Sequence, residues 1–168
     1  MKRIILPLFL ILMVNQNTAA QSEINTWFDF WVGKWDASWD EGEGKIGKGT
    51  NTISKVLDGS VVQEDFVITD GRQKGFKGMS LSVFGATSKQ WHQAWADNQG
   101  GFFNLIGERN GDVRMFKTLP RNVGGKEIVQ RMLFKDIKAD SFVWDWEKSE
   151  DGGKTWTLQW RISYRRSS

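Results

Sequence analysis

The sequence predicts an all-β protein of about ten antiparallel strands, closed either as a sandwich or as a meandering barrel. Past residue 30, apolar and polar side chains alternate in segments of six to ten residues, separated by turns of Gly, Asp, Asn and Lys. Several segments pair an aromatic face with a polar face, as strands of a sheet with one wet side do. The chain has no cysteine, so no disulfide supports this core.

The N-terminus has the layout of a secretory signal peptide. Lys2 and Arg3 precede an apolar run from Ile4 to Val14, which is too short to span a bilayer, and small residues follow at 18–20. We expect a signal peptide over residues 1–20 and a single domain over residues 21–168 with no membrane span. The mature protein would then be exported, either periplasmic or secreted, and a short N-terminal anchor is the alternative.

Charge gives little indication of a partner. Without residues 1–20, the 23 basic residues become 21 against 20 acidic ones, and the formal net charge falls from +3 to about +1. Positive and negative side chains are interleaved along the rest of the chain. No basic stripe indicates a nucleic-acid partner, and we expect none.

A run of tryptophans opens the predicted domain. Trp31, Trp35 and Trp39 are four residues apart, which is also the spacing of a helix face. A helix continuing through the glycines at 33, 42, 44, 47 and 49 would cost about 1 kcal/mol for each interior glycine. We therefore expect a strand from Lys34, while the segment 22–31 has room for a short helical turn that caps the sheet.

The remaining strands follow from nine turns. Pro120 is not expected to interrupt a strand. The last two strands show the alternation best, with Phe142, Trp144 and Trp146 on one face of the first. The nine turns lie at Asp40–Gly44, Asp58–Gly59, Asp70–Gly75, Thr87–Lys89, Asn98–Gly101, Asn110–Gly111, Asn122–Gly125, Lys138–Asp140 and Asp151–Gly153.

Several segments together resemble a known family. Gly33-Lys34-Trp35 matches the G-x-W signature of lipocalin-like (calycin) barrels. The longer pattern FDFWVGKW, VLDGSVVQEDF, GFKGMSLSVF, KQWHQAWADNQGGF and SEDGGKTW…SYRR resembles the exported lipocalin-like proteins of family DUF1579, over nearly the whole chain from Phe28 to Arg166. The block from Trp91 to Gly101 is the most specific part.

The resemblance implies an up-and-down β-barrel with an internal cavity and no established reaction. In such barrels the G-x-W tryptophan closes one end, and a basic residue near the last strand covers it. That assigns structural roles to Gly33 and Trp35, with Arg161 or Arg165 over the indole as a cation–π contact.

A second motif spans residues 149–156. Ser149, Asp151, Gly153 and Trp156 fit S-x-D-x-G-x-T-W, the Asp-box of sialidases and other propellers. We expect a hairpin in which the Ser and Asp oxygens bind backbone amides, the glycine adopts a conformation barred to other residues, and the indole packs below. One copy in a chain this short argues against a propeller.

Residues for catalysis are few. The absence of cysteine and the single histidine exclude thiol nucleophiles and the usual two-histidine zinc site, and no G-x-S-x-G or phosphate-binding loop occurs. On a strand, Gln93 shares one face with Trp91 and Trp95, and His92 lies on the other face. The roles of His92 and Gln93 therefore depend on which face points into the barrel. An inward His92 could meet a ligand, a substrate proton or a haem iron; otherwise it is structural, and we expect no cofactor.

Glu64 is the second candidate. It shares the more uniformly apolar face of its strand with Val62 and Phe66, so we expect it inside the barrel. A buried carboxylate needs a partner or a raised pKa, and Arg131 or Arg114 could supply the charge. The pair would serve either ligand binding or strand register.

We expect the barrel to bind a small, largely apolar molecule. An enzyme acting through Glu64 and His92, and a filled barrel serving as a structural or interaction module, are the alternatives. The candidate ligand-binding residues are Glu64, His92, Gln93, Trp95, Arg131 and Trp144.

Overall fold

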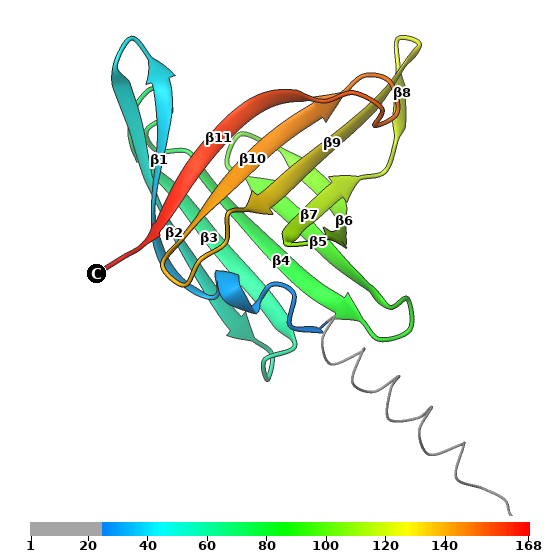
Figure 1. Cartoon of the computed structure of the whole chain (residues 1–168), viewed down its shortest axis with the longest axis horizontal. Helices are drawn as coiled ribbons and strands as arrows, with labels where there is room; N and C mark the ends of the chain where they lie inside the picture. Colours follow the sequence, from blue (N-terminus) through cyan, green and yellow to red (C-terminus); the bar gives the residue numbers. More distant parts are fainter. Residues whose placement is uncertain (1–24) are drawn as a thin grey trace, which may run out of the picture.

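The computed structural model describes residues 25–168, and the predicted signal peptide lies outside the described residues. One 3₁₀ turn, η1, precedes eleven strands (Figure 1). The elements are η1 (Asp29–Trp31), β1 (Gly33–Gly42), β2 (Lys45–Val56), β3 (Val61–Asp70), β4 (Lys77–Gly85), β5 (Gln90–Asp97), β6 (Phe102–Asn110), β7 (Val113–Thr118), β8 (Arg121–Val123), β9 (Lys126–Lys135), β10 (Ser141–Ser149) and β11 (Thr157–Arg166).

Ten of these strands close into an antiparallel barrel. Each strand from β1 to β6 pairs with the next, β7 pairs with β9, and β9, β10 and β11 continue the order. The ladder between β11 and β1 completes the ring, so the last strand of the chain lies beside the first. The predicted all-β, up-and-down barrel is confirmed, as is the helical turn before it.

The eleventh strand, β8, corrects the expectation that Pro120 does not interrupt a strand. β7 ends at Thr118, and β8 begins after Leu119 and Pro120, pairing only with β9. Proline has no N–H to donate and fixes φ, so the β7 ladder cannot run through it. The β8–β9 hairpin therefore projects from the upper end of the barrel in Figure 1, across from the β1–β2 hairpin.

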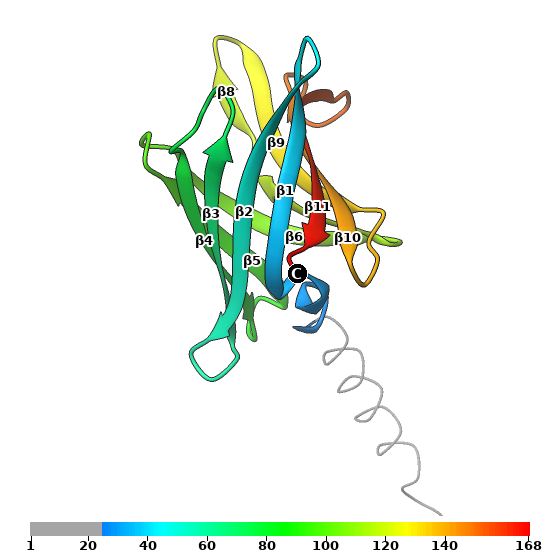
Figure 2. The same cartoon turned by 90° about the vertical axis from the view of Figure 1, so that its left-hand side faces the viewer.

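The N-terminal segment closes the lower end of the barrel, as Figures 1 and 2 show. Phe28 and Trp31 are almost fully buried there, and the Phe28 ring stacks on Phe116 with 4.4 Å between centroids. The indole of Trp35 is completely buried and donates a hydrogen bond of 2.7 Å to the carbonyl of Trp31. The segment thus becomes part of the core.

Arg166 covers Trp35, so the expectation of Arg161 or Arg165 is wrong. The Arg166 guanidinium lies 4.1 Å from the indole centroid and donates to the carbonyls of Val32 and Phe30. In the ladder Trp35 is opposite Arg166, whereas Arg165 is one residue away on the outer face.

Arg161 has a different role, because it donates two hydrogen bonds of 2.7 Å to Asp145 on the outer face. The first glycine of the G-x-W signature makes room for the cover. Gly33 has φ +139°, and a Cβ on it would overlap the guanidinium of Arg166.

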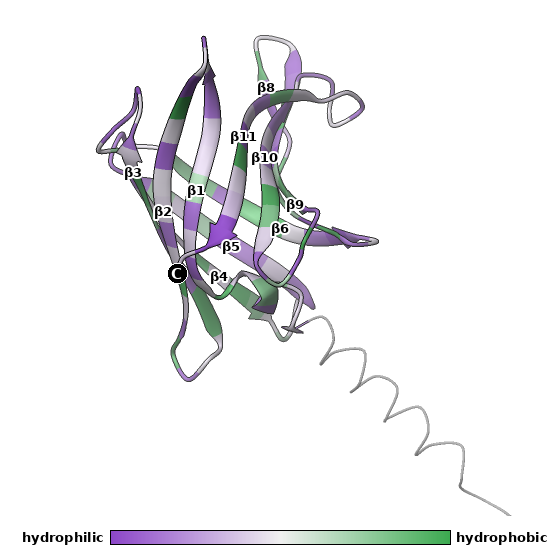
Figure 3. Cartoon of the chain, turned by 60° about the vertical axis from the view of Figure 1, so that its left-hand side comes forward, coloured by the Kyte–Doolittle hydropathy of each residue, from purple (hydrophilic) through white to green (hydrophobic). Residues whose placement is uncertain are grey.

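Apolar and polar side chains alternate along the strands, and the inward-pointing ones fill much of the barrel interior. Figure 3 shows this alternation as short bands of opposite hydropathy along the ribbons. Glycines on neighbouring strands provide space for the indoles, since a Cβ at Gly47 would overlap the ring of Trp39 and one at Gly78 the ring of Trp95. Large and small side chains are therefore paired across strands.

The Asp-box hairpin between β10 and β11 forms as expected. Asp151 Oδ1 accepts hydrogen bonds from the N–H groups of Lys154 and Thr155, and Ser149 Oγ accepts one from the N–H of Gly153. Gly153 has φ +91°, and the indole of Trp156 donates to its carbonyl. These bonds satisfy the backbone of a tight turn.

Removing the indole that closes the barrel should destabilise the fold strongly. We expect Trp35→Ala to lower the free energy of unfolding by about 3–5 kcal/mol, because a large buried ring and its packing are lost. Arg166→Ala should cost about 1–2 kcal/mol through the lost cation–π contact and hydrogen bonds. Urea unfolding measures both. Arg165→Ala is the control and should change little; equal effects of the two arginine variants would contradict the register.

The hairpin gives a second test. Asp151→Ala removes the acceptor of two backbone N–H groups and of the Thr155 hydroxyl, so the thermal midpoint should fall by a few degrees. Binding in the barrel should not change, because the turn lies outside the cavity. A variant of unaltered midpoint that had lost binding would place the turn at a binding site instead.

Candidate functional site

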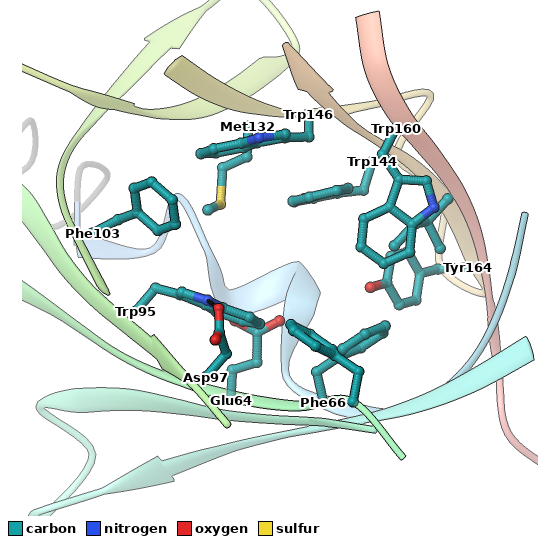
Figure 4. A pocket seen from close by; sticks show the side chains of 12 residues that line it. Glu64, Phe66, Trp95, Asp97, Phe103, Met132, Trp144, Trp146, Trp160 and Tyr164 are labelled. Atoms are coloured by element: carbon teal, nitrogen blue, oxygen red, sulfur yellow. Dashed lines mark hydrogen bonds between the residues drawn. The ribbon is translucent and has the colours of Figure 1, made fainter. Parts of the chain in front are cut away.

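A cavity of about 160 Å³ lies in the half of the barrel away from η1. Aromatic rings make most of its wall, and they come from strands on opposite sides of the barrel, as Figure 4 shows. The lining residues are Glu64, Phe66, Phe76, Trp95, Asp97, Phe103, Met132, Trp144, Trp146, Trp160, Ile162 and Tyr164.

The ring arrangement defines the shape of the wall. Trp144 and Trp146 are nearly parallel, with centroids 6.2 Å apart, and Trp160 meets Trp144 edge to face at 5.9 Å. Phe103 packs edge to face on Trp146 from the facing strand β6. These contacts hold the indoles in place, so the cavity is built before a ligand enters.

Glu64 forms the polar floor of the cavity. Strand alternation turns it inward between Val62 and Phe66, and only 6% of its surface is exposed. Its carboxyl accepts a hydrogen bond of 2.8 Å from the amide of Asn51 and one of 2.7 Å from the hydroxyl of Ser80. Both donors are uncharged.

Burial dominates the acidity of this group. Desolvation raises the pKa of Glu64 from 4.5 to about 7, although the hydrogen bonds from Ser80 and Asn51 act in the opposite direction. Near neutral pH the carboxyl therefore exists in both protonation states. Burial also raises the pKa of Tyr164, whose hydroxyl points into the same space (Figure 4).

Asp97 lies nearer the mouth, at the end of β5. Burial raises its pKa, but hydrogen bonds from the N–H of Gly101, the indole of Trp95 and the N–H of Gln99 outweigh this and lower the pKa below its ordinary value. Asp97 is thus an anion that holds Trp95 and the β5–β6 turn in place.

Three predicted ligand-binding residues line the cavity and a fourth lies close by. Trp95 and Trp144 are in the wall, and Glu64 is inside the barrel as expected. Gln93 also points inward and is buried, donating 2.9 Å to Ser82 Oγ, but it lies outside the lining of the cavity. The inward face of β5 is therefore the tryptophan face.

His92 is on the outer face of β5. Its Nε2 lies 3.1 Å from the hydroxyl of Ser88 in the β4–β5 turn, and its ladder neighbours are Val83 and Ile106. A haem inside the barrel does not fit this arrangement, because the histidine cannot reach the cavity. An acid–base pair of Glu64 and His92 does not form for the same reason.

Arg131 and Arg114 are not partners of Glu64, so that expectation is wrong. Arg131 pairs with Glu147 at 2.7 Å, and its guanidinium lies 3.7 Å from the centroid of a Trp156 ring. Arg114 donates to the carbonyls of Trp27 and Asp112. Glu64 accordingly has neutral partners, and the predicted ion pair that fixes register is replaced by hydrogen bonds.

The sequence interpretation missed Asn51, Ser80 and the part played by Tyr164 in the site. Asn51 occupies an inward position of β2, where Gly47, Gly49 and Ile53 are its neighbours on the same face. A lone amide on such a face was a signal that could have been used. Its Oδ1 has no hydrogen-bond partner among the described residues.

The lining of the cavity holds few titratable groups. Its only acids are Glu64 and Asp97, and it has no Lys, Arg or His. Among residues 25–168, no group of three or more His, Cys, Asp or Glu side chains could hold a metal ion. No helix in that range is long and apolar enough to cross a membrane.

Comparison with protein-family models and with curated proteins finds no match for this chain, so the resemblance to DUF1579 stays a prediction.

The buried carboxyl should make stability depend on pH. The folded-state pKa of about 7 exceeds the ordinary value of 4.5, so the folded state binds more protons between these values. The resulting stabilisation is complete below about pH 4.5 and is lost as the pH rises through 7. It is on the order of 3 kcal/mol, because one pKa unit corresponds to about 1.4 kcal/mol.

Urea unfolding between pH 5 and pH 8 measures this change. In Glu64→Gln the fall in stability over that range should be much smaller. Asp58→Asn is the control, because it removes an exposed carboxylate from the turn between β2 and β3 and should keep the wild-type dependence. Identical pH profiles for wild type and Glu64→Gln would contradict the assignment.

Proposed function

We propose that this protein is an exported β-barrel that binds one small, largely apolar molecule in its cavity. The observation that carries the proposal is the cavity itself, walled by four indoles and closed at its floor by a single carboxyl. The export step rests on the signal-peptide layout of residues 1–20 and on the resemblance to DUF1579.

The size and chemistry of the cavity support this function. A cavity of about 160 Å³ is close to the ~150 Å³ that accommodates a benzene-sized molecule in other proteins. Its wall of Trp, Phe, Met and Ile would bury nearly all the surface of such a ligand. A few polar groups at the floor and mouth would orient it.

The two alternatives have less support. An enzyme of the kind considered needs several titratable groups converging on one point, but His92 lies outside and no arginine lines the cavity. An interaction module needs a filled barrel and an exposed aromatic patch. The upper half of the barrel is not filled, and Phe102 is the only aromatic among the strongly exposed large apolar residues of the described chain.

Calorimetric titration with 2-phenylethanol tests the proposal. This neutral, single-ring probe should bind the wild-type protein, and Met132→Trp should weaken binding at least tenfold by filling the space between the walls. Met79→Trp is the matched control, because Met79 is 44% exposed on the outer face. His92→Ala is a second control and should bind like the wild type.

Two results would contradict the proposal. One is the absence of any saturable binding, and the other is equal affinity of the Met132 and Met79 variants. Thermal melts of each variant confirm that it is folded before binding is compared. Native mass spectrometry of protein purified from its own source then shows the mass of the natural ligand.

A further inference from the structure

No positively charged side chain lines the cavity. Its lining contains two carboxyl groups, Glu64 and Asp97, but no lysine, arginine or histidine. Buried carboxylates in proteins are normally paired with a cation or neutralised by a proton. None of the ion pairs among residues 25–168 includes Glu64. Within the described residues no cation neutralises this carboxyl, so its charge is removed either by a proton or by a cation that enters the cavity.

The hydrogen bonds of Glu64 are consistent with such a partner. Asn51 and Ser80 each donate one bond, to different oxygens of the carboxyl. Both come from the flanking strands β2 and β4, and neither residue lines the cavity. A carboxylate has about four lone-pair positions, so two donors leave acceptor capacity on the side that faces the rings.

The rings above the floor suit a cation as well. Trp95, Trp144, Trp146 and Trp160 line the cavity, together with Phe66 and Tyr164. The faces of such rings attract ammonium groups, most strongly where water is excluded, and Trp is the best of them. Figure 4 shows the Glu64 carboxyl and the Tyr164 hydroxyl directed into the space that these rings enclose.

We propose that the ligand of this cavity is a small aryl- or alkylamine, bound as its ammonium ion between the Glu64 carboxylate and the tryptophan faces. This rests on the proposed function, which it makes more specific. The apolar part of the amine would occupy the wall of the cavity, and the ammonium would reach the floor. The anionic Asp97 near the mouth adds to the preference for a cation.

Three probes that share a phenyl ring and a two-carbon chain separate charge from apolar contact. They are 2-phenylethylamine, 2-phenylethanol and 3-phenylpropanoate, which are cationic, neutral and anionic near neutral pH. At pH 8 the amine should bind at least tenfold more tightly than the alcohol, and the anion should bind most weakly. Glu64→Gln should abolish the advantage of the amine and leave the affinity for the alcohol within about twofold.

The pH dependence of binding gives a readout that needs no variant. The amine stays protonated below pH 8, so its affinity should fall several-fold from pH 8 to pH 6 as Glu64 takes up a proton, while that of the alcohol stays level. The other titratable groups facing this space are Asp97 from β5 and Tyr164 from β11, and both have their pKa values shifted away from that range. Asp58→Asn, in the exposed turn between β2 and β3, should behave as the wild type.

The outcomes separate the two proposals. Equal affinity for amine and alcohol, or an amine preference that survives in Glu64→Gln, overturns the inference and leaves the binding function standing. Failure of all three probes to bind overturns both. Should Glu64→Gln not fold, the pH profile of wild-type binding decides alone, since a level profile for the amine contradicts the inference.

Discussion

The contact between Trp35 and Arg166 joins the parts of the structure on which the barrel depends. The indole lies on β1 and the guanidinium on β11, so the contact spans the ladder that closes the ring. The same indole donates to Trp31, and the same guanidinium donates to Phe30 and Val32, which fixes the N-terminal segment across the lower end. With this end filled, the space in the barrel is confined to the other half.

The filled lower end explains the position of the buried polar groups Glu64, Asn51 and Ser80. The lower half is packed with Phe28, Trp31, Trp91, Phe116 and Phe134. Glu64, Asn51 and Ser80 lie at the boundary between the packed half and the open half. A carboxyl at this level has lost its water on one side and faces a cavity on the other, and this is the physical reason for its raised pKa.

Most of the fold could be predicted from the sequence because its signals are local. Alternation and turn residues define strands one at a time, and this was enough to place Glu64 inside and to recognise the hairpin at Asp151. Register is a relation between strands, so a displacement of one residue separated the expected Arg165 from the observed Arg166. Partners of buried groups depend on three or four strands at once, and for this reason Asn51 and Ser80 were missed and Arg131 was wrongly paired with Glu64. The face of His92 could not be chosen because both faces of β5 carry apolar residues.

The closing ladder also has a consequence for how the molecule reaches its folded state. Nearly all other strand pairs join neighbours in sequence, but the bond from Arg166 to Val32 spans 134 residues. The entropy cost of loop closure is larger for such a distant contact than for a hairpin. Hairpins can therefore form early, whereas the ladder between β1 and β11 forms after the rest of the sheet. Until then β1 and β11 are two unpaired edges of one curved sheet, and the matching edges of a second copy could pair with them instead. Strand exchange between two copies would thus compete with barrel closure at the β1–β11 ladder. The Arg166 side chain stabilises the pairing of these two strands within one chain.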